Sequence, residues 1–336
     1  MSNVSVSLPE EVDILYNQYG QRKPMGLSAE STKKPHFFLH RTFAGDNDLL
    51  LILNTKRCAY QCHFCQLPAK SSRTWIPTEE IVEQVRYVFF ELKHSLSLLD
   101  RVTLSNDGSV LDAKTFPEDA LLTIAECVNK LRRVRTLVLE TRLEFVNQGT
   151  LMKIQERAPR AKINILTGFE TQDDYIREEI LYKREPIKAF LSGLDEVARA
   201  GSDLTAYILY KPAQAMTDEE AYYEAEKTFD FLKHECASRN ISYSVRLNPM
   251  YLARGSKWAE IALDSPRYKP PRLTDVMKLA EKKAREGVKV YIGMSTEGLD
   301  EAEGSYMNRD DFSLNLVKSV ALFNSGKISQ FDWATL

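Results

Sequence analysis

The sequence predicts an α/β protein: a partial, TIM-like (β/α)6 barrel with a C-terminal α/β extension. Two observations lead to this prediction. Apolar runs typical of buried strands alternate with helical patterns of eight or more residues, six times between residues 46 and 250. Polar residues follow several of these runs directly, as expected at the carboxyl edge of a parallel sheet, where ligands bind in such folds.

The alternation predicts parallel pairing through right-handed crossovers, because strands joined by long helices cannot form hairpins. The predicted strands are residues 48–54, 101–105, 134–140, 161–169, 204–210 and 242–247. The predicted helices are residues 77–92, 117–131, 150–157, 173–181, 186–200 and 218–239. Pro77 and the acidic pair after it suit the first turn of a helix.

Three segments are expected along the chain. Residues 1–45 are an N-terminal lead-in with a short strand near 36–41, and residues 46–250 are the barrel. Residues 251–336, with helices at 273–287 and 311–323 and a strand at 288–292, are an extension that closes or caps the barrel. Residues 255–271, rich in Pro, Lys and Ser, are predicted to be an irregular connection and a candidate lid.

Composition limits the classes of partner and compartment. The 45 basic and 47 acidic residues give a net charge of −2, so no overall basic field attracts nucleic acid or an anionic membrane. No apolar run approaches the roughly 20 residues of a membrane span, and the first thirty residues lack a signal-type apolar stretch. We therefore expect a cytoplasmic protein with no membrane partner.

Three of the five cysteines, Cys58, Cys62 and Cys65, fall within eight residues. Thiolates suit zinc, copper(I) or iron–sulfur clusters, and the odd cysteine count argues against a disulfide framework. His63 lies between two of the cysteines, where a short loop cannot easily direct four ligands to one centre. Three thiolates on a 4Fe–4S cluster leave one iron open for chemistry. A zinc knuckle or three reduced core cysteines remain the alternatives.

The other two cysteines, Cys127 and Cys236, stand alone in helical patterns and are expected to be buried and inert. One cluster only is therefore predicted.

The C-x3-C-x2-C motif after a strand, with the aromatic Phe64 before the last cysteine, resembles the radical S-adenosylmethionine (radical SAM) superfamily. The resemblance implies a 4Fe–4S cluster held by the three cysteines, whose open iron chelates S-adenosyl-L-methionine (SAM). It also implies an external electron donor of the flavodoxin or ferredoxin type. Reductive cleavage of SAM would then give a radical that abstracts hydrogen from the substrate.

Further segments resemble one subgroup of that superfamily. Residues 140–144 (ETRLE) and 168–171 (GFET) are similar to elements of the Elongator catalytic subunit and the archaeosine-forming enzymes. Leu143 stands where that subgroup has a proline. Residues 268–271 (YKPP) are similar to a Tyr-x-Pro-Pro element of the archaeosine-forming enzymes.

The candidate cofactor-binding residues follow the cysteines and the strands. Radical SAM proteins hold the SAM amino group after the second strand, a carboxylate such as Glu170 can accept both ribose hydroxyls, and an arginine or lysine can bind a carboxylate. The full set is Phe64, Asn106, Asp107, Gly108, Ser109, Glu140, Glu170, Arg177, Lys183, Tyr207, Arg246 and Asn248.

The predicted function is a radical SAM enzyme that modifies a small molecule. A tRNA substrate is the first alternative, although the added domains of the tRNA-modifying relatives have no room in 336 residues. Transfer of a 3-amino-3-carboxypropyl group from SAM is a second alternative. A non-enzymatic zinc-binding module is a third.

Overall fold

The computed structural model describes residues 32–336 apart from 44, 66–70, 107, 254–255 and 294–308. The described residues fall into two compact units. The first contains Asp46–Ala59, Leu67–Ile165 and the residues up to Thr42, and the second contains Phe43–Gly45, Tyr60–Gln66 and Leu166–Leu336. The chain therefore passes from one unit to the other inside the cysteine motif.

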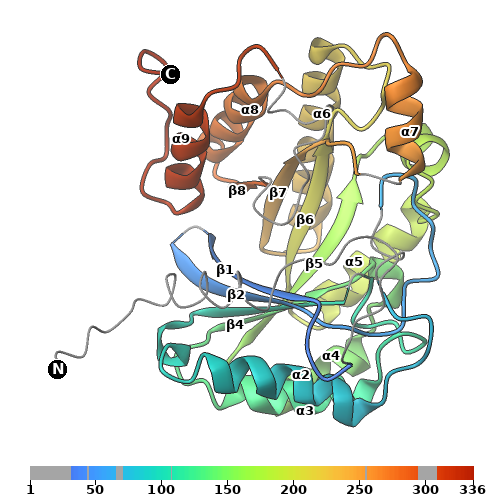
Figure 1. Cartoon of the computed structure of the whole chain (residues 1–336), viewed down its shortest axis with the longest axis vertical. Helices are drawn as coiled ribbons and strands as arrows, with labels where there is room; N and C mark the ends of the chain where they lie inside the picture. Colours follow the sequence, from blue (N-terminus) through green and yellow to red (C-terminus); the bar gives the residue numbers. More distant parts are fainter. Residues whose placement is uncertain (1–31, 44, 66–70, 107, 254–255, 294–308) are drawn as a thin grey trace. The chain divides into compact units, whose positions relative to one another are not determined.

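The first unit is built on a sheet with helices on one face. Its strands are β1 (Phe37–Phe43), β2 (Asp46–Ile52), β3 (Arg101–Ser105) and β4 (Thr136–Glu140). β2 pairs with β3 and β3 with β4, both in parallel. Helices α2 (Thr78–Glu91), α3 (Glu118–Asn129) and α4 (Gln148–Arg157) lie side by side along these strands (Figure 1). The short 3-10 helices η3 (Leu96–Leu98) and η4 (Leu143–Phe145) complete the unit's connections.

A buried charge network joins the first three strands. The Asp48 carboxylate is fully buried, with Oδ2 2.7 Å from Arg41 Nε and 3.8 Å from Arg101 Nε, and Thr103 Oγ1 donates to Oδ1 at 2.7 Å. Burial alone would raise the pKa of Asp48, but the two guanidinium groups and the hydrogen bonds hold it below its ordinary value. The network thus ties β1, β2 and β3 together as long as Asp48 is ionised.

The second unit continues the same pattern. Strand β5 (Lys162–Glu170) ends in it, and β6 (Asp203–Tyr210), β7 (Tyr243–Pro249) and β8 (Lys289–Ile292) pair in parallel. The helices are α5 (Ile187–Arg199), α6 (Asp218–Ser238), α7 (Lys257–Asp264), α8 (Leu273–Arg285) and α9 (Leu314–Asn324). α6 begins with a reciprocal Thr217–Glu220 capping box and packs on β6 and α8.

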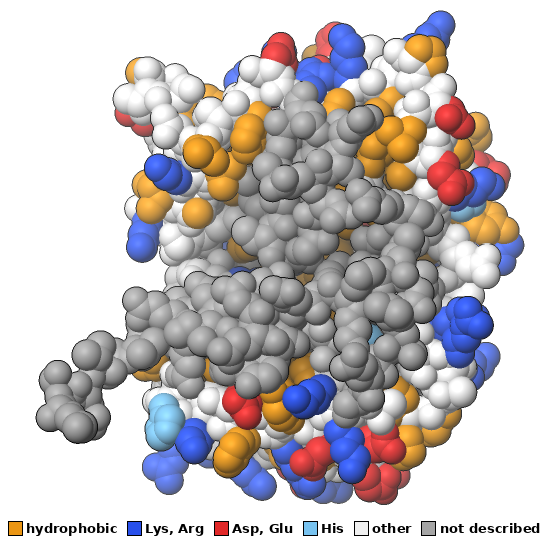
Figure 2. Space-filling model, in the orientation of Figure 1, with side chains coloured by type: hydrophobic (Ala, Val, Ile, Leu, Met, Phe, Trp, Pro, Cys, Tyr) orange, Lys and Arg blue, Asp and Glu red, His pale blue; other side chains and the backbone are white. Residues whose placement is uncertain are grey.

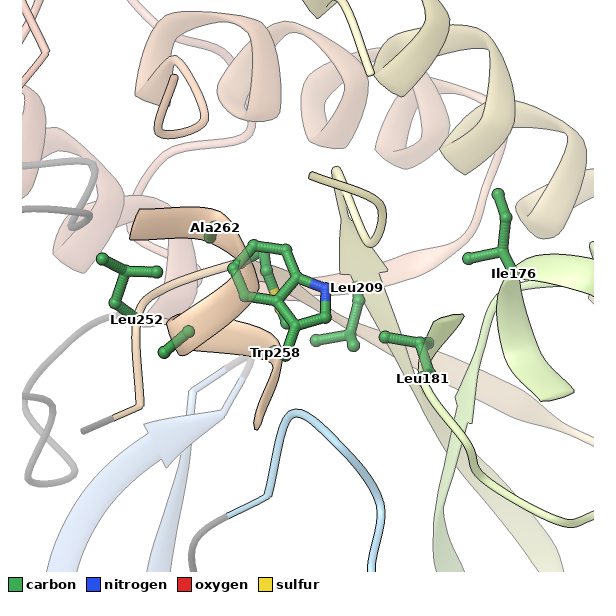
Figure 3. Close-up of a cluster of buried hydrophobic side chains, with 8 residues drawn as sticks. Ile176, Leu181, Leu209, Leu252, Trp258 and Ala262 are labelled. Atoms are coloured by element: carbon green, nitrogen blue, oxygen red, sulfur yellow. The ribbon is translucent and has the colours of Figure 1, made fainter. Parts of the chain in front are cut away.

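A hydrophobic cluster in the second unit surrounds Trp258. The buried members are Ile176, Leu181, Leu209, Met250, Leu252, Trp258, Ala259 and Ala262. Figure 3 shows the Trp258 indole in the middle of the cluster, with Leu252 on one side and Leu209 on the other. Indole Nε1 donates to the carbonyl of Pro212 at 2.7 Å, so the one polar atom of the ring is satisfied.

The predicted fold class is confirmed. The eight strands follow the order β1 to β8 in one sheet, and the six predicted barrel strands correspond to β2 to β7. The lead-in strand near residues 36–41 is β1, and the strand predicted at 288–292 extends the parallel sheet as β8. The division into three segments at residues 45 and 250 stays a prediction.

One local prediction was wrong. Residues 255–271 were expected to be irregular, but the described part contains α7, because Ser256 caps its N-terminus and Trp258 is buried in the cluster. The helix expected over 173–181 is present, and most of it is a π-helical turn, η5 (Ile176–Ile180), closed by a bond from Leu181 N to Ile176 O at 2.8 Å. None of the described helices is both long and apolar enough to cross a bilayer.

Candidate functional site

The cysteine loop (residues 58–65) follows β2, and backbone hydrogen bonds hold the residues that precede it. Arg57 N donates to the carbonyl of Ser72 at 2.8 Å, and Ser72 N donates to the carbonyl of Thr55 at 3.2 Å. Cys65 N donates to the carbonyl of Cys62 at 3.0 Å, which closes a turn at the end of the loop. All three thiols are half-buried and outside any disulfide.

The three thiols divide between the units, with Cys58 in the first and Cys62 and Cys65 in the second. No group of three His, Cys, Asp or Glu side chains within the described residues is already gathered as a metal site. The assignment of these cysteines as cluster ligands therefore stays a prediction. It is supported by the chemistry of three thiols in one short loop.

Asn106 and Gly108 lie beside Cys58 within the first unit. A Cβ placed on Gly108 would lie 3.2 Å from Cys58 Cβ and 3.6 Å from Asn106 Oδ1. Asn106 Nδ2 lies 3.1 Å from Thr55 Oγ1, whose own hydrogen points at the Lys56 carbonyl 3.2 Å away. Nδ2 also reaches the carbonyl of Ser109 at 3.5 Å. Two acceptors on this side of the amide fix its orientation, with nitrogen toward them and oxygen away.

The fixed orientation leaves Asn106 Oδ1 as a buried acceptor with no hydrogen-bond donor among the described residues. A buried carbonyl oxygen without a donor costs free energy, so such an atom in a native fold calls for an explanation. An ammonium group is the kind of ligand that supplies the missing donors. The residues beside Cys58 thus fit the amino group of a bound amino acid such as the methionine part of SAM.

Ser109 and Glu140 support this corner through the backbone. Ser109 Oγ accepts a hydrogen bond from Arg142 N at 3.0 Å, and the carbonyl of Glu140 accepts one from Val110 N at 3.0 Å. These bonds join the loop after β3 to the loop after β4. Asp107, also predicted for the site, lies outside the described residues.

His63 fixes the second half of the cysteine loop within the second unit. Its backbone N donates to Leu181 O and its backbone O accepts from Trp258 N, both at 2.9 Å. Nδ1 lies 3.0 Å from the carbonyl of Ile180, and because a carbonyl only accepts, Nδ1 carries the proton. The ring stacks on Tyr182 with centroids 4.7 Å apart. The predicted site residue Phe64, next in the chain, packs against the Trp258 cluster.

Glu170 ends β5 in a left-handed backbone conformation, with φ of +71°. Its side chain is buried, and its Oε1 lies 3.7 Å from Lys183 Nζ, which is itself 3.4 Å from Glu185 Oε2. A Cβ on Gly168 would overlap the Glu170 carboxylate, so the carboxylate depends on that glycine for its place. The two predicted residues Glu170 and Lys183 are therefore brought together as a buried ion pair.

Arg177, in contrast, is fully engaged in holding the segment after β5. Its guanidinium is 1% exposed and donates to the carbonyls of Thr171 at 3.1 Å and Glu185 at 3.2 Å. It also pairs with Asp174 and lies over the Phe169 ring, 5.6 Å from its centroid. These contacts give Arg177 a structural role, and we leave it out of the proposed ligand site.

Glu224 on α6 supports the same segment, and sequence patterns gave no sign of it. Thr171 and Thr228 both donate hydroxyl hydrogens to Glu224 Oε1, the second at 2.8 Å, and Thr228 Oγ1 accepts from Gln172 N at 3.0 Å. Burial raises the pKa of Glu224, despite the lowering effect of the two hydroxyls. A buried carboxyl group on a helix thus holds the residues that follow Glu170.

Tyr207, Arg246 and Asn248 come together on β6 and β7. Arg246 lies opposite Tyr207, and its Nε donates to Asn248 Oδ1 at 3.2 Å. Sequence reasoning missed two further members, Tyr291 on β8 and Gly293 directly after it. The sequence signal that could have identified this pair is a glycine directly after a strand.

The two remaining cysteines differ from each other. Cys236 is buried and its thiol pKa is raised to about 12 by burial, as expected for an inert core cysteine. Cys127 was expected to be buried but is half-buried. It lies near the end of α3, where only the face formed by residues such as Ile124 and Val128 packs inward.

Comparison with known proteins adds distant relatives, and no protein-family model matches the chain. An uncharacterized protein of Methanocaldococcus jannaschii, MJ0550, is 23% identical over 274 residues, covering 80% of this chain and 73% of that protein. Archaeosine synthase subunit beta of Thermococcus kodakarensis is 23% identical over 169 residues, covering 49% of this chain and 52% of that protein.

Matches among solved structures include a radical SAM enzyme. Streptococcus suis SuiB bound to S-adenosylmethionine gives a TM-score of 0.49 at 15% identity, covering 74% of this chain and 51% of SuiB. Escherichia coli HemN, a radical SAM enzyme, gives 0.43 at 12% identity, covering 73% of this chain and 54% of HemN. The match to archaeosine synthase subunit beta agrees with the predicted resemblance to the archaeosine-forming enzymes. The chain spans about half the length of the archaeosine synthase subunit and of SuiB.

Proposed function

We propose that this chain is a radical SAM enzyme in which Cys58, Cys62 and Cys65 hold a 4Fe–4S cluster and the reaction modifies a small molecule. The observation that carries the proposal is the buried Asn106 Oδ1 beside Gly108 and Cys58, which has no hydrogen-bond donor among the residues that the structure describes. When bound, the cluster supplies the electron that cleaves SAM and begins radical chemistry.

The chain's own residues have separate tasks in this proposal. Asn106 Oδ1 accepts a hydrogen bond from the amino group of SAM, and Gly108 lets the ligand approach the backbone because it has no side chain. The Glu170 carboxylate accepts hydrogen bonds from the ribose hydroxyls, and the Lys183 ammonium lies beside it as a counter-charge. His63 holds the cysteine loop against the Trp258 cluster, so the loop is shaped before any ligand binds.

A small-molecule substrate agrees with the charge distribution. The net charge is −2, and over α2 and α3 basic side chains are interspersed with acidic ones (Figure 2). A polyanion binds best to a surface where Lys and Arg are gathered. A tRNA substrate is the second candidate, which the likeness to an archaeosine synthase subunit favours. In either case an external donor of the flavodoxin or ferredoxin type supplies the electron.

The test is anaerobic reconstitution with iron and sulfide, then reduction and incubation with SAM. We expect visible thiolate-to-iron absorption and 5′-deoxyadenosine as the nucleoside product. Methylthioadenosine instead would indicate 3-amino-3-carboxypropyl transfer. A colourless protein with stoichiometric zinc would overturn the proposal.

A variant connects the test to the structure. Asn106→Ala should weaken SAM binding by about one to two decades while the cluster absorption persists, because it removes a charge-assisted hydrogen bond but no cluster ligand. Equal SAM affinity in the variant and the parent protein would remove Asn106 from the site.

A further inference from the structure

The strands β6 to β8 have one apolar and one polar face. Ile208, Leu247 and Ile292 lie opposite one another across the strands and are buried. Their neighbours Tyr207, Arg246 and Tyr291 form the adjacent cross-strand row, and successive residues of a strand point to opposite faces. The same polar face carries Thr205 and Ser244, whose hydroxyl oxygens are 2.8 Å apart. One face thus packs as core, and the other carries polar and aromatic groups.

Arg246 is the centre of this polar face. It is 7% exposed, and its guanidinium carbon lies 5.3 Å from the ring centroids of both Tyr207 and Tyr291. The two tyrosines come from the strands on either side of β7, so the rings flank the guanidinium. A guanidinium flanked in this way hydrogen-bonds through its edge, in its own plane.

Asn248 and Gly293 shape the surroundings of that edge. Arg246 Nε can only donate, so the Asn248 atom that it contacts at 3.2 Å is the amide oxygen. The amide nitrogen of Asn248 therefore points away from Nε as a further donor. A Cβ on Gly293 would overlap Asn248 Oδ1 and lie 3.2 Å from Arg246 Nε. The glycine keeps this space open for the Arg246–Asn248 pair.

We propose that Arg246, flanked by Tyr207 and Tyr291 and assisted by Asn248, binds a carboxylate of the substrate. The identification of the ligand as the substrate rests on the proposed function. The assignment of a carboxylate site to these residues does not. A guanidinium edge matches the two coplanar oxygens of a carboxylate.

The site is assigned to the substrate because the groups proposed for SAM follow other strands. The cysteine loop follows β2, Asn106 follows β3, and Glu170 ends β5, whereas the carboxylate site is on β6 to β8. SAM also carries a carboxylate, so the experiment must distinguish the two ligands.

The probe is ¹³C-labelled acetate, titrated into the full-length reconstituted protein and followed by NMR line broadening, with inorganic phosphate as a parallel titration. Arg246→Met should weaken acetate binding by a factor of ten or more, and Arg246→Lys should restore only part of it. The control Arg199→Met removes the same charge from an exposed arginine of α5 and should have no effect. Circular dichroism checks that each variant folds.

Gly293→Ala is the second variant, because it displaces the Asn248 amide without removing a charge. It should weaken acetate binding several-fold even if Arg246→Met does not fold. SAM affinity, measured by equilibrium dialysis, should stay within a factor of two in Arg246→Met.

Three results would overturn the proposal. The first is acetate binding that is unchanged in Arg246→Met or Gly293→Ala. The second is displacement of bound acetate by SAM, and the third is phosphate binding tenfold tighter than acetate binding. Arg246-dependent acetate binding in a protein that forms no cluster would overturn the proposed function and leave the carboxylate site standing.

Discussion

The Glu170 carboxylate occupies the space that a side chain at Gly168 would fill. This relationship explains why a glycine, an aromatic residue and a glutamate follow one another at the end of β5. Phe169 points to the opposite side, where it packs on Phe190 and Phe231 with centroids 4.2 and 5.3 Å away. Glycine and glutamate thus act as one structural unit on the polar side of the strand, and the carboxylate reaches Lys183.

Glu170→Gln should weaken SAM binding by about one to two decades, because it removes a charge-assisted acceptor worth ~1.5–3 kcal/mol. The cluster absorption should remain, and the protein should stay folded because Lys183 keeps its second partner, Glu185. Equilibrium SAM binding to the reconstituted proteins is the measurement.

Glu185→Gln is the matched control for this prediction. It removes the other carboxylate beside Lys183 and should leave SAM affinity within a factor of about three. Equal SAM affinity in Glu170→Gln and the parent protein would show that Glu170 has only a structural role.

Replacing Cys58, Cys62 or Cys65 by alanine should abolish both the cluster absorption and SAM cleavage. Cys127→Ala and Cys236→Ala should retain both, because these thiols belong to helices α3 and α6. Iron content, visible absorption and nucleoside products check the prediction. A cluster that survives loss of Cys62, or that disappears with Cys127, would show that the ligand assignment is wrong.

Trp258→Ala should lower the free energy of unfolding by ~3–5 kcal/mol, since the indole is fully buried among the apolar residues of its cluster. Trp75→Ala, at a tryptophan that is 47% exposed, should change it by less than ~1 kcal/mol. Denaturant unfolding measures both values.

The same experiment bears on the lid hypothesis for residues 255–271. A small effect of Trp258→Ala would mean that α7 contributes little to the folded core and is free to act as a lid. The expected large effect makes the start of α7 part of the core.

Glu224→Gln should raise the thermal unfolding midpoint at neutral pH. The pKa of Glu224 is raised in the folded protein, so the stability that its neutral form provides is fully present below the ordinary pKa. That stability decreases as pH rises through the folded-state pKa, by up to ~1.4 kcal/mol per pH unit between the two pKa values.

Glutamine stays neutral at every pH. The gain in the thermal unfolding midpoint should therefore vanish below about pH 4, where Glu224 is protonated in both the folded and the unfolded protein. Glu219→Gln, at an exposed position of the same helix, should show little gain at either pH. Thermal scans at several pH values check this, and a gain that does not depend on pH would contradict the assignment.

The sequence by itself determined the fold class, because strand and helix periodicities are local and recur in order from β2 to β8. It also determined the cysteine loop, since the spacing of three cysteines within eight residues needs no tertiary information. The polar residues after the strands followed from the rule that parallel strands end at one edge.

Only the tertiary structure decided which polar residues serve which role. Arg177 and Lys183 are both basic residues after β5, yet Arg177 bonds to backbone carbonyls while Lys183 pairs with Glu170. The orientation of the Asn106 amide, the tyrosines beside Arg246 and the buried carboxyl of Glu224 depend on contacts between segments distant in sequence. Burial, amide orientation and pKa are properties of an assembled environment, so no pattern of neighbouring residues along the chain encodes them.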